Sequence, residues 1–339
     1  MAVQTVLGNI RKEDVGIALM HEHIFMDLRK KFDKTDLEQT DDLVTEERIP
    51  ELRKNHRLLK DNLFLSNEEL AEKEVQLFCS SGGKTIVNMS NYGMGSNLSA
   101  LKNISHATGV NIIECTGFYT EATHPEWMYD YSVNQMAELF IRDITEGIGD
   151  SGSKAGIIGE IGTSAVITNR ERKVLDAACI AQKETGASIS VHIDPWVENG
   201  LDVLNQLNNN GADLTRVVIG HTDAVINLDY IRAMLDRGAV IEMDNFAKRY
   251  ETPGLHFDTD EQRIEAIVQL ISEGYQDQIL MSTDICLKTD LYQYGGGGYG
   301  HIPRTIIPKL RERGVADAVI EAITEKTPAR LLNIEAATI

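Results

Sequence analysis

The sequence predicts a (β/α)8 TIM barrel, formed as a single domain over residues 1–339, and two patterns carry this prediction. The first is a set of short apolar runs rich in β-branched residues, too short for helices and continuous enough for strands buried on both faces. There are eight of them, at residues 17–23, 84–90, 110–116, 156–162, 187–192, 216–221, 239–244 and 279–284. The second is the amphipathic segments of helical period between them. Eightfold strand–helix alternation favours a closed parallel barrel.

The segment 168–186 shows why these connections are predicted to be helices. Thr168 is placed to cap the helix, Glu171 completes a capping box, and Gly186 follows as a C-terminal glycine. The segments 198–210, 226–238 and 259–273 have the same character. A doubly wound sheet would instead place a glycine-rich phosphate turn after its first strand, where this chain has His21-Glu22-His23.

Composition excludes several classes of protein. The chain is 42% hydrophobic and 25% charged, as expected of a globular protein with a large core. It contains no apolar run of about eighteen residues and begins without an apolar signal segment. Its four cysteines form no CxxC pair, which favours reduced thiols in the cytoplasm.

The net charge of −19 arises from 52 acidic and 33 basic residues. Such a surface repels nucleic acid and anionic membranes. The expected partner is therefore a small-molecule substrate, and a homodimer is left open.

Candidate metal ligands lie at the ends of five of the eight runs. In barrels of this class the C-terminal ends of the strands form the active face. His21 and His23 lie two apart on one strand, so both point the same way. Together the strand ends bring to this face His21, His23, Glu160, His192, His221 and Asp284.

This donor set predicts a metal centre. Imidazole with carboxylate suits zinc, and also manganese, cobalt or iron, and the absence of thiolates argues against a structural zinc site. Six ligands are too many for one tetrahedral ion and fit two divalent ions bridged by one carboxylate. Glu160, on the fourth strand, is the candidate bridge.

The strand ends resemble the amidohydrolase superfamily and, within it, the phosphotriesterase family. The resemblance rests on the segments at 19–27, 157–164, 191–194, 218–224 and 281–285. Further likeness to the branch of phosphotriesterase-related proteins comes from the GEIG segment, from 170–175 and from the YGG-x-GY-x-HI pattern at 294–302.

The resemblance implies a ligand arrangement. His21, His23 and Asp284 would hold the more buried ion, and His192 and His221 the more exposed one. The founding organophosphate-degrading enzymes bridge their ions with a carbamylated lysine, where this chain has Glu160. The reaction class is therefore implied, but the substrate is not: amides or N-acyl amino acids and lactones rank together ahead of phosphotriesters.

The expected chemistry gives one catalytic role to Asp284, which would take a proton from the attacking hydroxide and deliver it to the leaving group. Tyr119 is a candidate for orienting the substrate. Three cations near the predicted mouth, Lys248, Arg249 and Lys288, hint at an anionic substrate in so acidic a chain. Asp244 is interpreted not as a ligand but as a residue that either supports one of the ligands or caps the loop.

Two loops remain to be placed. The charge-dense segment 27–48 is interpreted as a solvated loop with a helix in it, with a lid over the mouth as the alternative. The glycine run at 295–300 is expected to form a flexible loop beside the site. Two rival functions also stay open: a single-metal deaminase, which would not need Glu160, and a non-catalytic metal-binding barrel.

Overall fold

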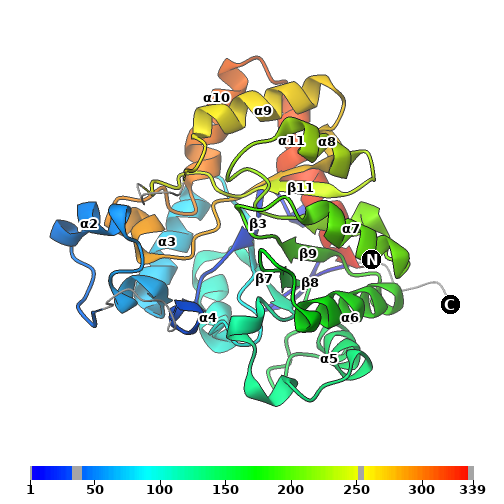
Figure 1. Ribbon diagram of the computed structural model, residues 1–339. Coiled ribbons are helices and arrows are strands. Elements are labelled where there is room, and N and C mark those ends of the chain that lie inside the picture. The colour runs from blue at the N-terminus through cyan, green and yellow to red at the C-terminus, as the bar shows by residue number, and fades with distance from the viewer. Residues whose placement is uncertain (1, 33–39, 251–255, 335–339) are drawn as a thin grey trace.

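The fold is a ring of eight parallel strands surrounded by helices (Figure 1). The computed structural model describes residues 2–32, 40–250 and 256–334. All eight predicted strands are present and pair in chain order: β3 (Ala18–Glu22), β6 (Thr85–Asn88), β7 (Asn111–Thr116), β8 (Ile157–Gly162), β9 (Ile189–His192), β10 (Val217–Ile219), β11 (Val240–Met243) and β12 (Ile279–Met281). The predicted α/β barrel is confirmed.

The first and last strands of the ring approach each other at the end that carries the candidate ligands. The backbone amide of Asp284 donates to the carbonyl of His21 at 3.2 Å. The hydroxyl of Ser282 accepts from the amides of Met20 and His21 at 2.9 and 3.0 Å. The sheet is thus nearly closed, and the end of β3 lies against the chain that leaves β12.

The helices that follow the strands form the outer layer. They are α3 (Glu68–Ser80), α4 (Leu98–Thr108), α5 (Val133–Thr145), α6 (Asn169–Thr185), α7 (Gly200–Asn209), α8 (Leu228–Leu235) and α9 (Asp260–Ser272), followed by α10 (Ile307–Glu312), α11 (Asp317–Glu321) and α12 (Thr327–Leu332). The prediction for α6 is confirmed, since Thr168 and Glu171 form the capping box and Gly186 adopts φ 73°. A side chain there would be strained, which is why the helix ends at a glycine.

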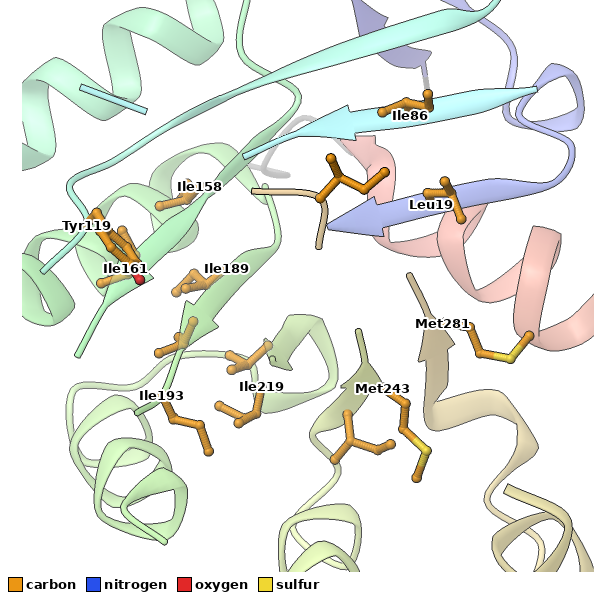
Figure 2. Close-up of a cluster of buried hydrophobic side chains, with 14 of the residues drawn as sticks. Leu19, Ile86, Tyr119, Ile158, Ile161, Ile189, Ile193, Ile219, Met243 and Met281 are labelled. Carbon is orange, nitrogen blue, oxygen red and sulfur yellow. The ribbon is translucent and has the colours of Figure 1, made fainter. Parts of the chain in front are cut away.

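The hydrophobic core lies in two layers, because successive residues of a strand face opposite sides of the sheet. One cluster, which includes Met20, Ile113 and Val240, fills the barrel interior and is joined by Val3 and Leu331. The other packs the outer side of the sheet against the helices. Figure 2 shows part of this outer layer, with side chains from strands around the ring, among them Leu19, Ile86, Ile158, Ile219, Met243 and Met281.

Smaller elements complete the chain. An antiparallel sheet joins β1 (Ala2–Thr5), β2 (Gly8–Ile10) and β13 (Asn333–Ile334). The segment between β3 and α3 contains β4 (Met26–Asp27), α1 (Arg29–Phe32), α2 (Ile49–Lys54) and β5 (Phe64–Leu65). In the part of the chain that the structure describes, no helix has both the length and the apolar character needed to cross a membrane.

Candidate metal centre

The six predicted ligands converge at the C-terminal mouth of the barrel, with Glu160 in the middle. Its Oε1 lies 3.4 Å from His23 Nε2, and its Oε2 lies 3.4 Å from both His21 Nε2 and His192 Nδ1. His221 Nε2 is 3.9 Å from the same Oε2. Asp284 Oδ1 lies 3.3 Å from His23 Nε2. One carboxylate therefore faces four imidazoles, two of them carried by β3.

These distances fit metal coordination better than direct hydrogen bonding. Donor atoms bound to a tetrahedral ion at about 2.0–2.1 Å lie about 3.3–3.4 Å apart, the spacing around Glu160. Three groups of donors lie close enough together to hold an ion: His21–His23–Asp284, Glu160–His192–His221 and His21–His221–Asp244. Glu160 Oε2 and both ring nitrogens of His21 are buried and form no hydrogen bond with the described residues, although His21 Nδ1 lies 3.3 Å from Asp244 Oδ2. Buried polar atoms without a partner are costly, so the donor set suits cations.

Two irregular strands aim these side chains into the mouth. The pairing register of β3 shifts between Leu19 and Glu22, and that of β8 shifts between Ile158 and Ile161. Each shift spans a candidate ligand: His21 lies within the shifted part of β3, and Glu160 lies within that of β8. Such β-bulges redirect side chains and are common beside functional sites.

Two candidate ligands have a backbone conformation that is rare outside glycine. His221 has φ 56° and Asp284 has φ 44°. L-residues seldom adopt these angles, which persist only where the surroundings hold them. His221 follows the end of β10, and Asp284 follows the end of β12. The turn of the backbone after each strand therefore sets the direction of the side chain.

The ring nitrogens that face away from Glu160 have partners of their own. His23 Nδ1 lies 2.9 Å from Ser90 Oγ, and His221 Nδ1 lies 2.9 Å from Asp244 Oδ1. Asp244 Oδ2 is also 3.3 Å from His21 Nδ1. Carboxylate partners of this kind orient metal-binding imidazoles. Asp244 is close to two histidines, but it meets their outer nitrogens, so it supports the rings and adds no ligand at Glu160.

The loop that carries Asp284 is held from two sides. The carboxylate of Glu22 accepts from the amide and hydroxyl of Thr283, both at 2.7 Å, and from the amide of Ile285 at 2.9 Å. These bonds clamp the residues on either side of Asp284. Lys248 Nζ donates to the carbonyl of Asp284 and lies 3.4 Å from its Oδ2 and 3.2 Å from Asp290. The orientation of Asp284 is thus fixed by residues from β3 and the loop after β11.

The pKa shifts in the cluster indicate that its carboxylates are stabilised by positive charge. Burial would raise the pKa of Glu160, but the charge of His21 and hydrogen bonds from the histidines hold that pKa well below its usual value. Burial lowers the pKa of His192 to about 3, whereas Asp244 overcomes burial and raises that of His221 to about 10. His221 Nε2 and His192 Nδ1, 2.6 Å apart, can share a proton. Divalent cations would supply the same charge in exchange for protons.

The cluster forms the floor of a cavity of about 240 Å³, which suits a small substrate. Of the predicted substrate contacts, Tyr119 and Lys248 line this cavity. The hydroxyl of Tyr119 lies 3.2 Å from His192 Nε2. Lys248, however, is paired with the two carboxylates named above. The cavity wall is largely apolar or aromatic and includes Met26, Leu28, Phe32, Trp196, Tyr250 and Phe257.

Two other predicted contacts lie outside this cavity. Lys288 donates to Asp61 at 2.6 Å. Arg249 is exposed and lines a separate surface hollow with Tyr292 and residues 295–297 of the glycine run. Neither side chain lines the cavity, because proximity in sequence to β11 or Asp284 does not set the direction of a side chain outside the strands. Their role as substrate contacts stays a prediction. The glycine run likewise lies beside the second hollow, although Tyr299 does reach the His23 carbonyl.

The segment after β3 contributes more to the cavity than a solvated loop would. Leu28, Lys31, Phe32, His56 and Arg57 all line the wall, while residues 33–39 lie outside the described part of the chain. Lys31 and Arg57 were missed from sequence, because they sit among many charged residues and no periodicity marks them.

The fold and the site together define a hydrolase of the metal-dependent barrel class, and comparisons with known proteins agree. The pattern that describes the phosphotriesterase family matches residues 1–332. The chain belongs to the phosphotriesterase family. It is a metal-dependent hydrolase, as the sequence predicted.

Two relatives match over 98% of both chains. One is an N-acetyltaurine hydrolase of Dictyostelium discoideum, 34% identical. The other is a phosphotriesterase-related protein of Nematostella vectensis, 35% identical. The predicted likeness to the phosphotriesterase-related branch is thereby confirmed.

Two solved structures are also similar. A resiniferatoxin-binding protein from Rhodobacter sphaeroides has a TM-score of 0.92 and 32% identity, over 99% of this chain and 96% of that one. A lactonase from Listeria monocytogenes has a TM-score of 0.82 and 25% identity, over 99% of this chain and 100% of that one.

Proposed function

We propose that this protein hydrolyses the amide bond of a small N-acyl compound at two divalent metal ions held by His21, His23, Glu160, His192, His221 and Asp284. The observation that carries the proposal is the placement of Glu160 between four imidazoles at the base of a small cavity. The N-acetyltaurine hydrolase that matches over 98% of both chains supports the choice of an amide.

The donor set favours Zn²⁺, and Mn²⁺, Co²⁺ or Fe²⁺ would also suit imidazole with carboxylate. When bound, such ions lower the pKa of a water molecule and polarise the scissile carbonyl. The carboxylate of Glu160 lies between the histidines of β3 and those that end β9 and follow β10, where it would serve both ions. A carbamylated lysine is therefore not required. A single-metal deaminase would leave this central carboxylate without a purpose, so the two-ion arrangement is preferred.

Asp284 is the proposed proton carrier. Its Oδ1 faces His23 and the cluster, while its Oδ2 faces Lys248. Water adds to the carbonyl carbon, the C–N bond breaks, and Asp284 passes the proton from the water to the leaving nitrogen. Tyr119, beside His192, is placed to orient the carbonyl oxygen of the substrate.

Lactone opening is the second candidate, because it requires the same attack on a carbonyl carbon. The structural similarity to a lactonase favours it. Phosphotriester cleavage ranks behind both. A cytoplasmic location and a homodimer stay predictions, the former supported by free cysteines that form no disulfide among the described residues.

The test combines metal analysis with a substrate screen. The purified, metal-replete protein is expected to hold about two divalent ions per chain. It should hydrolyse N-acetyltaurine or N-acyl amino acids faster than aryl phosphotriesters, with lactones as the comparison. One tightly held ion per chain after full repletion would favour the single-metal deaminase. Turnover of lactones alone would show that the substrate is a cyclic ester and not an amide.

A further inference from the structure

Two cations line the cavity without forming an ion pair with any carboxylate of the described residues. The guanidinium of Arg57 contacts His56 Nε2 through Nε at 3.3 Å and lies 4.3 Å above the Phe32 ring. Within residues 2–32, 40–250 and 256–334, no carboxylate pairs with Arg57 or with Lys31. Lys31 Nζ instead donates to the hydroxyl of Tyr119. Both side chains line the cavity wall.

Neighbouring cations differ, which makes these two unusual. Lys248 is balanced by Asp284 and Asp290, Lys288 by Asp61, and Arg29 by Asp27 at 2.7 Å. The chain carries 52 acidic residues against 33 basic ones, so carboxylates are plentiful. Two cavity cations that pair with no carboxylate in the described part of the chain therefore leave positive charge available to a ligand.

Lys31 and Arg57 lie in different surroundings within the cavity. Lys31 lies near the floor, since Tyr119 connects it to His192. Arg57 packs on the Phe32 ring, whose centroid also lies 6.0 Å from Lys31 Nζ. The Phe32 ring is 6.4 Å from His56, and His56 stacks on Tyr250 at 5.1 Å. A ligand whose reacting bond sits at Glu160 can thus extend along this aromatic wall toward the guanidinium of Arg57.

We propose that Arg57, assisted by Lys31, binds a terminal sulfonate or carboxylate of the substrate, so that this enzyme selects N-acyl compounds with an anionic end group. The inference rests on the proposed amide hydrolysis for the position of the reacting bond. The planar guanidinium offers paired donors that match a sulfonate or carboxylate. An apolar wall around them strengthens the attraction, because little water competes.

The experiment compares three acetamides of similar size with the metal-replete enzyme. They are N-acetyltaurine, N-acetyl-β-alanine and the uncharged N-[2-(methylsulfonyl)ethyl]acetamide. Arg57→Met keeps the length of the side chain and removes its charge. It should lower kcat/KM for the two anions about 10- to 100-fold, mainly through KM, which is the effect of one lost charged hydrogen bond. The uncharged sulfone should change less than about twofold, within the range of a neutral surface change.

Two controls separate charge from folding. Arg57→Lys should restore part of the selectivity for anions. Arg53→Met, in the same segment but lining the second hollow, should leave all three rates unchanged. Equal losses of Arg57→Met on charged and uncharged substrates, or no loss on either, would overturn the inference.

A failure of the proposed function gives a different result. If the unmodified enzyme cleaves none of the acetamides, calorimetric titration with N-acetyltaurine and with the sulfone still tests the anion site. The anion should then bind more tightly than the sulfone to the unmodified protein, and this difference should vanish in Arg57→Met. Equal binding of both compounds to the unmodified protein would contradict the assignment of Arg57.

Discussion

Two buried glutamates on neighbouring strands, Glu160 on β8 and Glu114 on β7, have pKa values shifted in opposite directions. Glu160 points into the mouth of the barrel, where the histidines outweigh burial and hold its pKa well below the usual value. Among the described residues, Glu114 accepts hydrogen bonds from neutral donors, Asn88 and Ser96 at 3.0–3.3 Å and the thiol of Cys115 at 3.9 Å. Burial there raises its pKa to about 8.

The difference follows from the face of the sheet on which each side chain lies. Ile113 and Cys115, on either side of Glu114, belong to the core inside the barrel, so Glu114 points to the helix layer. The comparison teaches that burial alone does not identify a functional carboxylate. What distinguishes Glu160 is the set of groups it faces, and three substitutions of Glu by Gln test this distinction.

The largest effect is expected from Glu160→Gln. The amide keeps the shape of the side chain but removes the charge that faces four imidazoles, so the protein should lose one of its two ions. The rate kcat/KM should fall at least about a thousandfold on every substrate, because ion binding contributes several kcal/mol to such reactions. Metal analysis and steady-state kinetics measure both consequences.

A control with CO2 addresses the identity of the bridge. Reconstitution of the unmodified apo-protein with metal should recover the same activity in CO2-depleted buffer as with bicarbonate, since no lysine has to be carbamylated. A strong bicarbonate requirement, or a fully active Glu160→Gln variant, would show that another residue bridges the ions.

An intermediate effect is expected from Glu22→Gln. The amide group would oppose one of the three donors that Glu22 now accepts from Thr283 and Ile285. The clamp around Asp284 would loosen, and kcat should fall about 10- to 100-fold with little change in KM, the scale of a disturbed partner of a metal ligand. The split between kcat and KM is the readout.

Thr283→Val is the graded control for this clamp, because it removes the hydroxyl and leaves both amides bonded to Glu22. It should lower kcat by less than Glu22→Gln does. If Glu22→Gln instead raises KM and leaves kcat unchanged, Glu22 does not position Asp284 for the reaction.

The smallest effect on activity, close to none, is expected from Glu114→Gln, which should change stability instead. The folded-state pKa of about 8 exceeds the ordinary value of 4.5, so the folded protein holds a proton that the unfolded chain has released between these values. This group therefore lowers the free energy of unfolding as pH rises from about 4.5 to about 8. The variant, which cannot ionise, should gain stability relative to the unmodified protein across that window.

Thermal unfolding at several pH values measures this gain, and a shift in Tm of a few degrees corresponds to about 1 kcal/mol. A difference in Tm that does not change between pH 5 and pH 8 would contradict the proposed ionisation of Glu114. A large loss of activity would remove the contrast with Glu160.

Features that depend on local sequence patterns could be predicted, and features that depend on contacts between segments could not. The eight apolar runs, the capping box of α6 and the positions of the six candidate ligands depend on local periodicity and on the common direction of parallel strands, both visible in sequence. Asp244, which directly follows β11, was interpreted as a residue that supports a ligand or caps the loop, and the structure places it beside His21 and His221. Lys31, Arg57, Arg249 and Lys288 lie in the segments that follow the strands, Lys31 in the four-residue helix α1. Neither periodicity over so short a stretch nor a shared strand direction sets these side chains.

The sequence by itself determined the barrel and the ends of the strands at which chemistry could occur, because hydrophobic period and strand polarity are local properties of the chain. Only the tertiary structure decided the rest. The shifted registers of β3 and β8 and the left-handed turns at His221 and Asp284 aim the ligands. Contacts between distant segments then pair Lys248 and Lys288 with carboxylates, whereas no carboxylate of residues 2–32, 40–250 or 256–334 pairs with Arg57. Burial and pairing depend on which segments meet in space.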